Sequence, residues 1–98
     1  MSLLVILRPP AESDVQLIRA ELEAIREGLG DRFAARLGEL LERIESMPGI
    51  YGVLWRDVRA ARVKRFRYLV YYVEFPDRVE VLAIMHGARD ASAWKRRI

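Results

Sequence analysis

The stretch YLVYYVEFPDRVEVLAIMHGARD, residues 68–90, decides the fold of this chain. Two runs rich in Val, Ile, Leu and Tyr flank Pro76-Asp77, which is the pattern of a β-hairpin. Pro76 pre-sets a turn φ, and the Asp77 side chain can hydrogen-bond to its own backbone. The run Val79–Met85 is almost wholly apolar, as is typical of a strand buried on both faces. We therefore expect Val79–Met85 to lie inside a sheet.

Length and composition favour one small domain over residues 1–98. The chain has no cysteine, which excludes disulfides and thiolate metal sites and fits a reducing cytosol. Its apolar start, residues 1–7, lacks the basic region and cleavage site of a signal peptide. No run approaches the roughly 20 apolar residues that span a bilayer.

The first half of the chain predicts a strand and two helices. Residues 3–7 form a short apolar run closed by Pro9-Pro10, which favours a strand. Residues 11–28 and 31–47 each carry an apolar stripe at helical spacing. Ser13 and Gln16 fit a capping box for the first helix, and Gly28 and Gly30 fit the turn after it. The short connection predicts an antiparallel helical hairpin, with Ala34, Ala35 and Gly38 as candidates for close helix contact.

The second half predicts strands at 58–66, 68–75 and 79–85, after a connector or ragged edge strand at 50–57. Residues 91–98 fit a last helical turn. The order is β-α-α-β-β-β, which predicts an α+β domain with a helical hairpin on one face of a small, mostly antiparallel sheet. We expect the other face to be open and to carry part of the basic residues.

The positive charge lies in the second half of the chain. Residues 1–50 carry 6 arginines and 9 acids, a net of −3, whereas residues 51–98 carry 11 basic residues and 5 acids, a net of +6. Within 56–67, five arginines and one lysine accompany a single acid, Asp57. Such a cluster fits a track for RNA or DNA, with tyrosines as stacking platforms. It equally fits a solvated edge strand or a surface for an acidic protein.

His86 is the single histidine and follows the buried strand. It could serve as a general acid or base in RNA cleavage, because its ordinary pKa lies near 6.5. Arg59, Lys64 and Arg89 are then candidate charge stabilisers. The alternative is that His86 caps the strand end through a hydrogen bond to a loop, with Asp90 as the candidate partner.

Arg89-Asp90 and Trp94 could fasten the tail to the sheet, with Trp94 as the anchor. The sequence contains no Gly-rich phosphate loop, metal-ligand cluster or nucleophile elbow, so we expect no cofactor and no metal. The residues predicted to contact a target or nucleic acid are Arg59, Arg62, Lys64, Arg65, Arg89 and Trp94.

The element order, the phrase VRAARVKRFRYLVYYVEF and the ending VEVLAIMHGARDASAW resemble the RelE/ParE superfamily of type II toxin–antitoxin toxins. The ending, with His86, Arg89, Asp90 and Trp94, is most similar to the ParE-type group. Arg67 and Ala91 stand where many relatives have proline.

This resemblance implies a small cytoplasmic toxin neutralised by an antitoxin whose amphipathic C-terminal segment wraps it. One branch of the superfamily cleaves mRNA on the ribosome, and the ParE branch is associated with inhibition of DNA gyrase. Three functions follow as hypotheses: a toxin that binds a protein target such as gyrase, a ribosome-dependent mRNA interferase, and a non-toxic antitoxin-binding module. No membrane partner is expected.

Overall fold

The computed structural model describes residues 3–89 and 91–98 and has a five-stranded sheet in the order β1-β5-β4-β3-β2. The strands are β1 (Leu4–Leu7), β2 (Val53–Trp55), β3 (Val58–Arg62), β4 (Tyr68–Glu74) and β5 (Arg78–His86). β1 pairs with β5 in parallel, and the other neighbouring strands are antiparallel. The predicted β4–β5 hairpin is confirmed, and β5 lies inside the sheet as expected.

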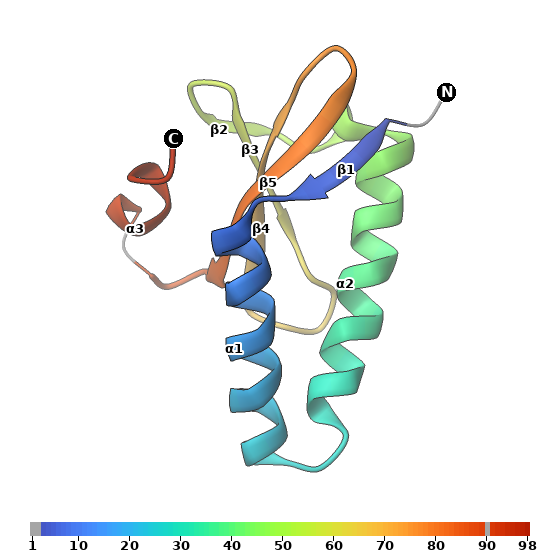
Figure 1. Cartoon of the computed structure of the whole chain (residues 1–98), viewed down its shortest axis with the longest axis vertical. Coiled ribbons are helices and arrows are strands. Elements are labelled where there is room, and N and C mark those ends of the chain that lie inside the picture. Colours follow the sequence, from blue (N-terminus) through green and yellow to red (C-terminus); the bar gives the residue numbers. More distant parts are fainter. Residues whose placement is uncertain (1–2, 90) are drawn as a thin grey trace.

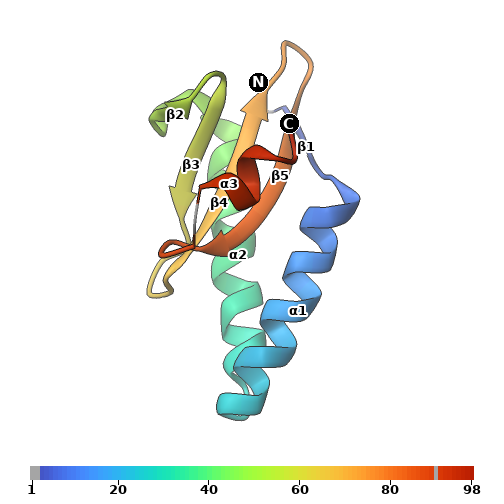
Figure 2. The ribbon, with the colours of Figure 1, turned by 90° about the vertical axis from the view of Figure 1, so that its left-hand side faces the viewer.

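Helices α1 (Pro9–Ile25) and α2 (Leu29–Ser46) form a hairpin that covers one face of the sheet and extends beyond its end (Figure 1). A 3₁₀ turn, η1 (Pro48–Ile50), leads from α2 to β2. The short helix α3 (Ser92–Lys95) lies on the opposite face, in front of β4 and β5 in Figure 2. The predicted α+β class is therefore confirmed. None of the helices in the described ranges combines the length and apolar character needed to span a membrane.

The main core lies between the helical hairpin and the sheet. Phe33 and Ile44 from α2 and Val70 and Tyr72 from β4 are fully buried there. The Phe33 ring meets Tyr68 edge-on, with ring centroids 5.4 Å apart. Burial of each such side chain contributes roughly 1.5–3 kcal/mol, so this layer fixes how the hairpin sits on the sheet.

A second, smaller cluster lies on the opposite face and corrects the expectation that this face is open. Trp94 of α3 is 3% exposed and stacks on Tyr71, with centroids 4.7 Å apart and planes 15° apart. Trp55 of β2 meets the Trp94 ring edge-on at 6.0 Å. The side chains of Tyr71 and Tyr72 point to opposite faces, and both are buried. Part of the second face is therefore covered by the chain's own C-terminus.

The first helix begins two residues earlier than predicted. Pro9 and Pro10 occupy its first positions, where the missing proline N–H leaves no intrahelical hydrogen bond unmade. The predicted capping box at Ser13 and Gln16 is wrong, because both residues lie inside α1 and no side chain caps its start. The two prolines thus start a helix as well as ending β1.

The turn between the helices depends on two glycines and one carboxylate. Gly28 has φ +84°, a conformation that suits glycine. The Glu23 carboxylate accepts hydrogen bonds from the N–H groups of Gly28 (2.8 Å) and Gly30 (3.0 Å). A Cβ on Gly30 would lie 2.7 Å from the Arg19 carbonyl oxygen, whereas one on Gly38 would meet nothing within 4 Å. The close helix contact is therefore at Gly30, and the prediction that placed it at Gly38 is wrong.

The third strand is shorter than predicted. β3 ends at Arg62, and the chain then turns through Arg65, which has φ +70°, while the Phe66 N–H donates to the Val63 carbonyl at 3.0 Å. Lys64 therefore lies in a turn and does not alternate with Arg62 along a strand. Residues 53–55 form the edge strand that the sequence left open between a strand and a connector.

Candidate functional site

The four residues predicted as ribonuclease candidates do not share one cavity. Arg59 projects from β3 toward η1, where its Nη1 donates to the Tyr51 carbonyl oxygen at 2.5 Å. Lys64 lines a hollow against α2. His86 and Arg89 line a different cavity, beside α1. Arg59 is thus engaged in holding the start of the β2 segment in place.

Tyr72 belongs to the same local network as Arg59. Its Oη donates to the Pro48 carbonyl oxygen at 2.6 Å, and its side chain is fully buried. Burial raises the pKa of Tyr72 to about 12, although the positive charge of Arg59 partly opposes the increase. Tyr72 therefore stays neutral at physiological pH and serves as a core residue. It is not a stacking platform for nucleic-acid bases.

His86 adopts the capping arrangement considered from the sequence. Its Nδ1 accepts a hydrogen bond from the Ala88 N–H at 3.1 Å, and the Gly87 N–H donates to the Arg67 carbonyl at 2.7 Å. The imidazole also meets the Tyr68 ring edge-on, at 5.7 Å. When neutral, the ring therefore carries its proton on Nε2. Asp90, the partner considered earlier, lies outside the described residues.

A cavity of about 270 Å³ between α1 and the end of β5 contains the candidate histidine. Tyr68, His86 and Arg89 line it from the sheet side, and Glu21 lines it from α1. Burial, with a smaller effect from the Glu21 carboxylate, raises the pKa of the Tyr68 hydroxyl. Asp14 lines the cavity as well, so a histidine, an arginine, two carboxylates and a tyrosine meet in one place, which is a composition suited to binding polar groups.

A feature that sequence reasoning missed closes the free edge of β5. β1 pairs only with residues up to Val81, so the second half of β5 has no strand on that side. The Asp14 carboxylate accepts the Ile84 N–H at 2.9 Å and forms a two-point ion pair with Arg97, at 2.5 and 3.1 Å. Arg97 also donates to the Leu82 carbonyl at 3.2 Å. An arginine near the chain end thus satisfies a strand edge that would otherwise be open.

The other half of β5 has a second ion-pair network. Glu80 accepts from Arg8 Nε at 2.8 Å and from Arg78 Nε at 2.6 Å. These hydrogen bonds, from Arg8 first and Arg78 second, hold the pKa of the Glu80 carboxyl below its usual range. Because Arg8 directly precedes α1, this network ties the start of the helical hairpin to the sheet.

The remaining predicted contact residues differ in their availability. Arg62 is exposed, but its Nε donates to the Phe66 carbonyl at 3.0 Å. Lys64, Arg65 and Arg89 are exposed. Trp94 is buried against Tyr71, which gives it the anchoring role and leaves almost none of its surface for a target.

Exposed apolar side chains gather where α2 ends and the edge strand β2 begins. Met47, Ile50, Val53 and Leu54 are 50–56% exposed. We call these four residues the β2 apolar edge. Such a patch, next to a strand with an unpaired edge, is typical of a surface that docks another polypeptide. Periodicity did not reveal it, because these residues lie in a segment without a regular pattern.

No group of three or more His, Asp or Glu residues in the described part of the chain comes together as a metal site. The candidate residues lie in three places around the sheet. They comprise a polar cavity at the end of β5, a basic region around the β3–β4 turn and the β2 apolar edge.

Two comparisons with known proteins give matches. A family model described as ParE toxin of type II toxin-antitoxin system, parDE, matches residues 5–91. A solved structure of the chromosomal ParDE TA system from P. aeruginosa has a TM-score of 0.65 and 10% sequence identity, and the likeness covers 87% of this chain and 96% of that chain. At that identity the likeness concerns the fold. No curated protein sequence matches this chain.

Proposed function

Since the chain belongs to the family of ParE toxins of type II toxin–antitoxin systems, we propose that it is neutralised by a cognate antitoxin and acts by binding an essential macromolecule. DNA gyrase is the first target to test, and the site of action is the cytoplasm. The observation that carries this proposal is the family match over residues 5–91. The match covers α1, α2 and the sheet except for the first residue of β1, and it ends before α3.

The placement of the candidate catalytic residues supports binding over catalysis. RNA cleavage by general acid–base chemistry needs a proton donor, a proton acceptor and a charge stabiliser around one phosphate. Here Arg59 holds the Tyr51 carbonyl, while Lys64 and His86 line different cavities. One cavity contains His86 with Arg89, and a second hollow contains His86 with Arg62 and Arg67, whereas Arg59 and Lys64 line neither of them.

The β2 apolar edge supports the antitoxin part of the proposal. An amphipathic segment can cover Met47, Ile50, Val53 and Leu54 with its apolar side and extend the sheet beyond β2. Its acidic residues would meet nearby arginines such as Arg56, which is exposed.

Regulated expression in bacteria tests the proposal. Expression of the chain alone should stop growth, and co-expression of the neighbouring small reading frame should restore growth and yield a complex on purification. Val53→Asp with Leu54→Asp should stay toxic but resist neutralisation, whereas the matched pair Leu17→Asp with Ile25→Asp, on exposed α1 positions, should still be neutralised. Harmless expression of the wild-type chain would instead identify a non-toxic antitoxin-binding module.

A ribosome-dependent mRNA interferase is the second candidate, because His86 and Arg89 line the same cavity. If the chain cleaves mRNA, His86→Ala and Lys64→Ala should each restore growth of expressing cells, and mRNA cut sites should disappear. Full toxicity of both variants would exclude this mechanism and leave target binding.

A further inference from the structure

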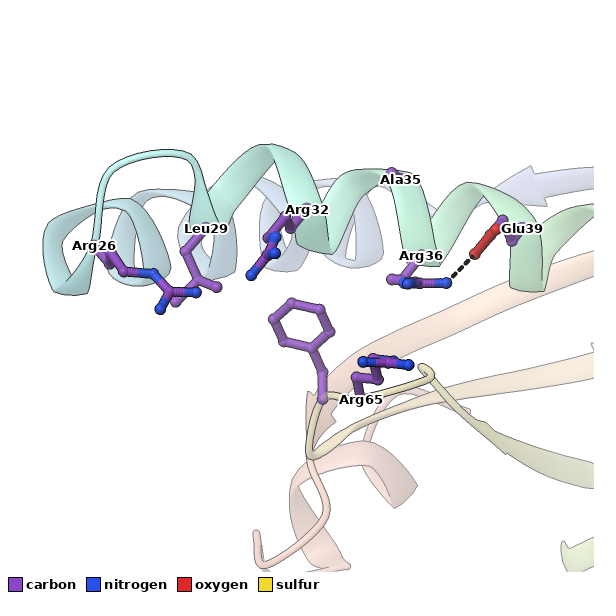
Figure 3. A pocket seen from close by; sticks show the side chains of 8 residues that line it. Arg26, Leu29, Arg32, Ala35, Arg36, Glu39 and Arg65 are labelled. Atoms are coloured by element: carbon purple, nitrogen blue, oxygen red, sulfur yellow. Dashed lines mark hydrogen bonds and ion pairs between the residues drawn. The ribbon is translucent and has the colours of Figure 1, made fainter.

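A groove runs along the side of α2 that faces the β3–β4 turn. It consists of three adjoining hollows of about 300, 480 and 170 Å³. The first two share Arg26 and Arg32, and the last two share Arg36 and Glu39, so the hollows adjoin one another along α2. Figure 3 shows Arg26, Arg32 and Arg36 on the helical side and Arg65 across from them. We call this feature the α2 groove.

The α2 groove is strongly cationic. Its basic side chains include Arg26, Arg32, Arg36, Arg43, Lys64 and Arg65. Two carboxylates also line it, Glu27 and Glu39, and the Glu39 carboxylate pairs with Arg36 at 3.2 Å. Arg62 also lines the groove. Within the described ranges, no carboxylate pairs with the six groove cations other than Arg36. These six guanidinium or ammonium groups therefore line the groove without an ion-pair partner, and they outnumber its two carboxylates.

The spacing of these cations makes a track. Arg32, Arg36 and Arg43 are four and seven residues apart, so they lie on one face of α2. With a rise of 1.5 Å per residue, they are about 6 and 10 Å apart along the helix axis. Lys64 and Arg65 face them from the turn, which keeps the groove positive on both walls. A linear polyanion can contact such charges one after another.

The groove fits nucleic acid better than an acidic polypeptide. A bound amphipathic peptide needs a continuous apolar strip to cover, and the strongly exposed large apolar residues are all outside the groove. The apolar lining of its largest hollow is limited to Leu29, Ala35 and Phe66. Guanidinium groups in contrast match phosphate oxygens with two-point hydrogen bonds.

We propose that the α2 groove is a binding site for the phosphodiester backbone of nucleic acid. The site recognises charge and backbone and has no built-in sequence preference, as in other grooves that follow a single strand. None of the four residues of the β2 apolar edge lines the groove, although Tyr51, next to Ile50 in the chain, lies at its end. Sequence reasoning placed the track on β3; the fold instead combines its turn residues, Lys64 and Arg65, with arginines of the helical hairpin.

Fluorescence anisotropy with the purified full chain tests the site. The probes are a fluorescein-labelled 12-nucleotide DNA strand, the same sequence as RNA, the DNA duplex, and a labelled 12-residue glutamate peptide. Arg32→Gln with Arg65→Gln should weaken oligonucleotide binding about tenfold or more. It should also reduce the slope of log K against log salt by about 1.4, because a single strand loses about 0.7 per phosphate contact.

The matched control is Arg56→Gln with Arg96→Gln, which removes the same charge from exposed positions outside the groove. This control should change the affinity by less than about twofold. Equal weakening by both double variants would show an effect of net charge alone and overturn the site. Tighter groove-dependent binding of the glutamate peptide than of the oligonucleotides would also overturn it. Thermal unfolding of both variants should match wild type, which separates loss of binding from loss of fold.

Discussion

Removal of the Trp94 side chain should test whether the C-terminal helix is part of the folded core. The ring is 3% exposed, stacks on Tyr71 at 4.7 Å and meets Trp55 at 6.0 Å. Truncation of a buried Trp to Ala typically costs about 3–5 kcal/mol, of which a stacked aromatic pair accounts for about 0.5–1.5 kcal/mol. Because α3 has only four residues, the helix can partly collapse into the gap. We therefore expect Trp94→Ala to cost about 3 kcal/mol.

Urea unfolding followed by far-ultraviolet circular dichroism measures this loss without a tryptophan signal. A domain of this size has a total stability of about 5–15 kcal/mol, so the transition midpoint should move clearly toward lower urea. Trp55→Ala is the matched control, because Trp55 is only partly buried on an edge strand; we expect about 1 kcal/mol. A loss below about 1 kcal/mol for Trp94→Ala would refute the anchoring role of α3.

Three further perturbations probe the edge of β5, the helix contact and the buried phenol. Asp14→Ala should lower the free energy of unfolding in urea by about 2–3 kcal/mol, because it leaves the Ile84 N–H and Arg97 without their partner. Glu12→Ala, at an exposed position, should change it by less than about 0.5 kcal/mol. Similar effects of both variants would contradict the role of Asp14 in closing the β5 edge. Gly30→Ala should lower the melting temperature, because its Cβ clashes with the first helix and reduces the free energy of unfolding by about 1–3 kcal/mol. Gly38→Ala should raise the melting temperature, because it increases the free energy of unfolding by about 0.5–1 kcal/mol. A stabilising effect of Gly30→Ala would disprove the contact. Burial raises the pKa of Tyr72 from 10.0 to about 12, so the neutral phenol should contribute fully to stability below pH 10 and this contribution should decline as the pH increases through 12. Tyr72→Phe should remove this alkaline decline in stability. An unchanged decline would assign it to another group.

The strands and helices could be predicted from the sequence where the pattern was strong. The apolar run in β5 and the proline turn before it led directly to the central hairpin. The same local rules misplaced the start of α1, because Pro9-Pro10 can end a strand and begin a helix with equal ease. Local patterns do not decide between these roles. In the fold, Arg8 lies between β1 and α1 and donates to Glu80 of β5, a contact that no local pattern predicts.

The candidate surfaces were harder to predict, because they join residues that are distant in sequence. Asp14 and Arg97 are 83 residues apart, and neither lies in a motif. From the sequence alone, the arginines of α2 are typical of the solvent-facing side of an amphipathic helix. Only the fold places them opposite Arg65. In contrast, the capping role of His86 depends on a near neighbour in the chain, Ala88. The partners that anchor Trp94, Tyr71 and Trp55, are distant in sequence, and the sequence suggested only that Trp94 fastens the tail to the sheet.

The dispersal of the ribonuclease candidates also changes how the basic residues are understood. Arg59, Arg62 and Lys64 looked like one cluster within the sequence. In the fold, Arg59 and Arg62 each donate to a backbone carbonyl, and Lys64 faces α2. A basic run in a sequence thus divides into residues that hold loops and residues that remain free to bind.

Supercoiling by purified DNA gyrase, measured with increasing amounts of the purified chain, tests the proposed mode of action most directly. We predict that the chain inhibits supercoiling or traps cleaved DNA at concentrations near that of the enzyme, that His86→Ala inhibits equally well, and that the purified antitoxin relieves the inhibition. Unimpaired supercoiling at a large excess of a chain that still stops growth would contradict gyrase as the target.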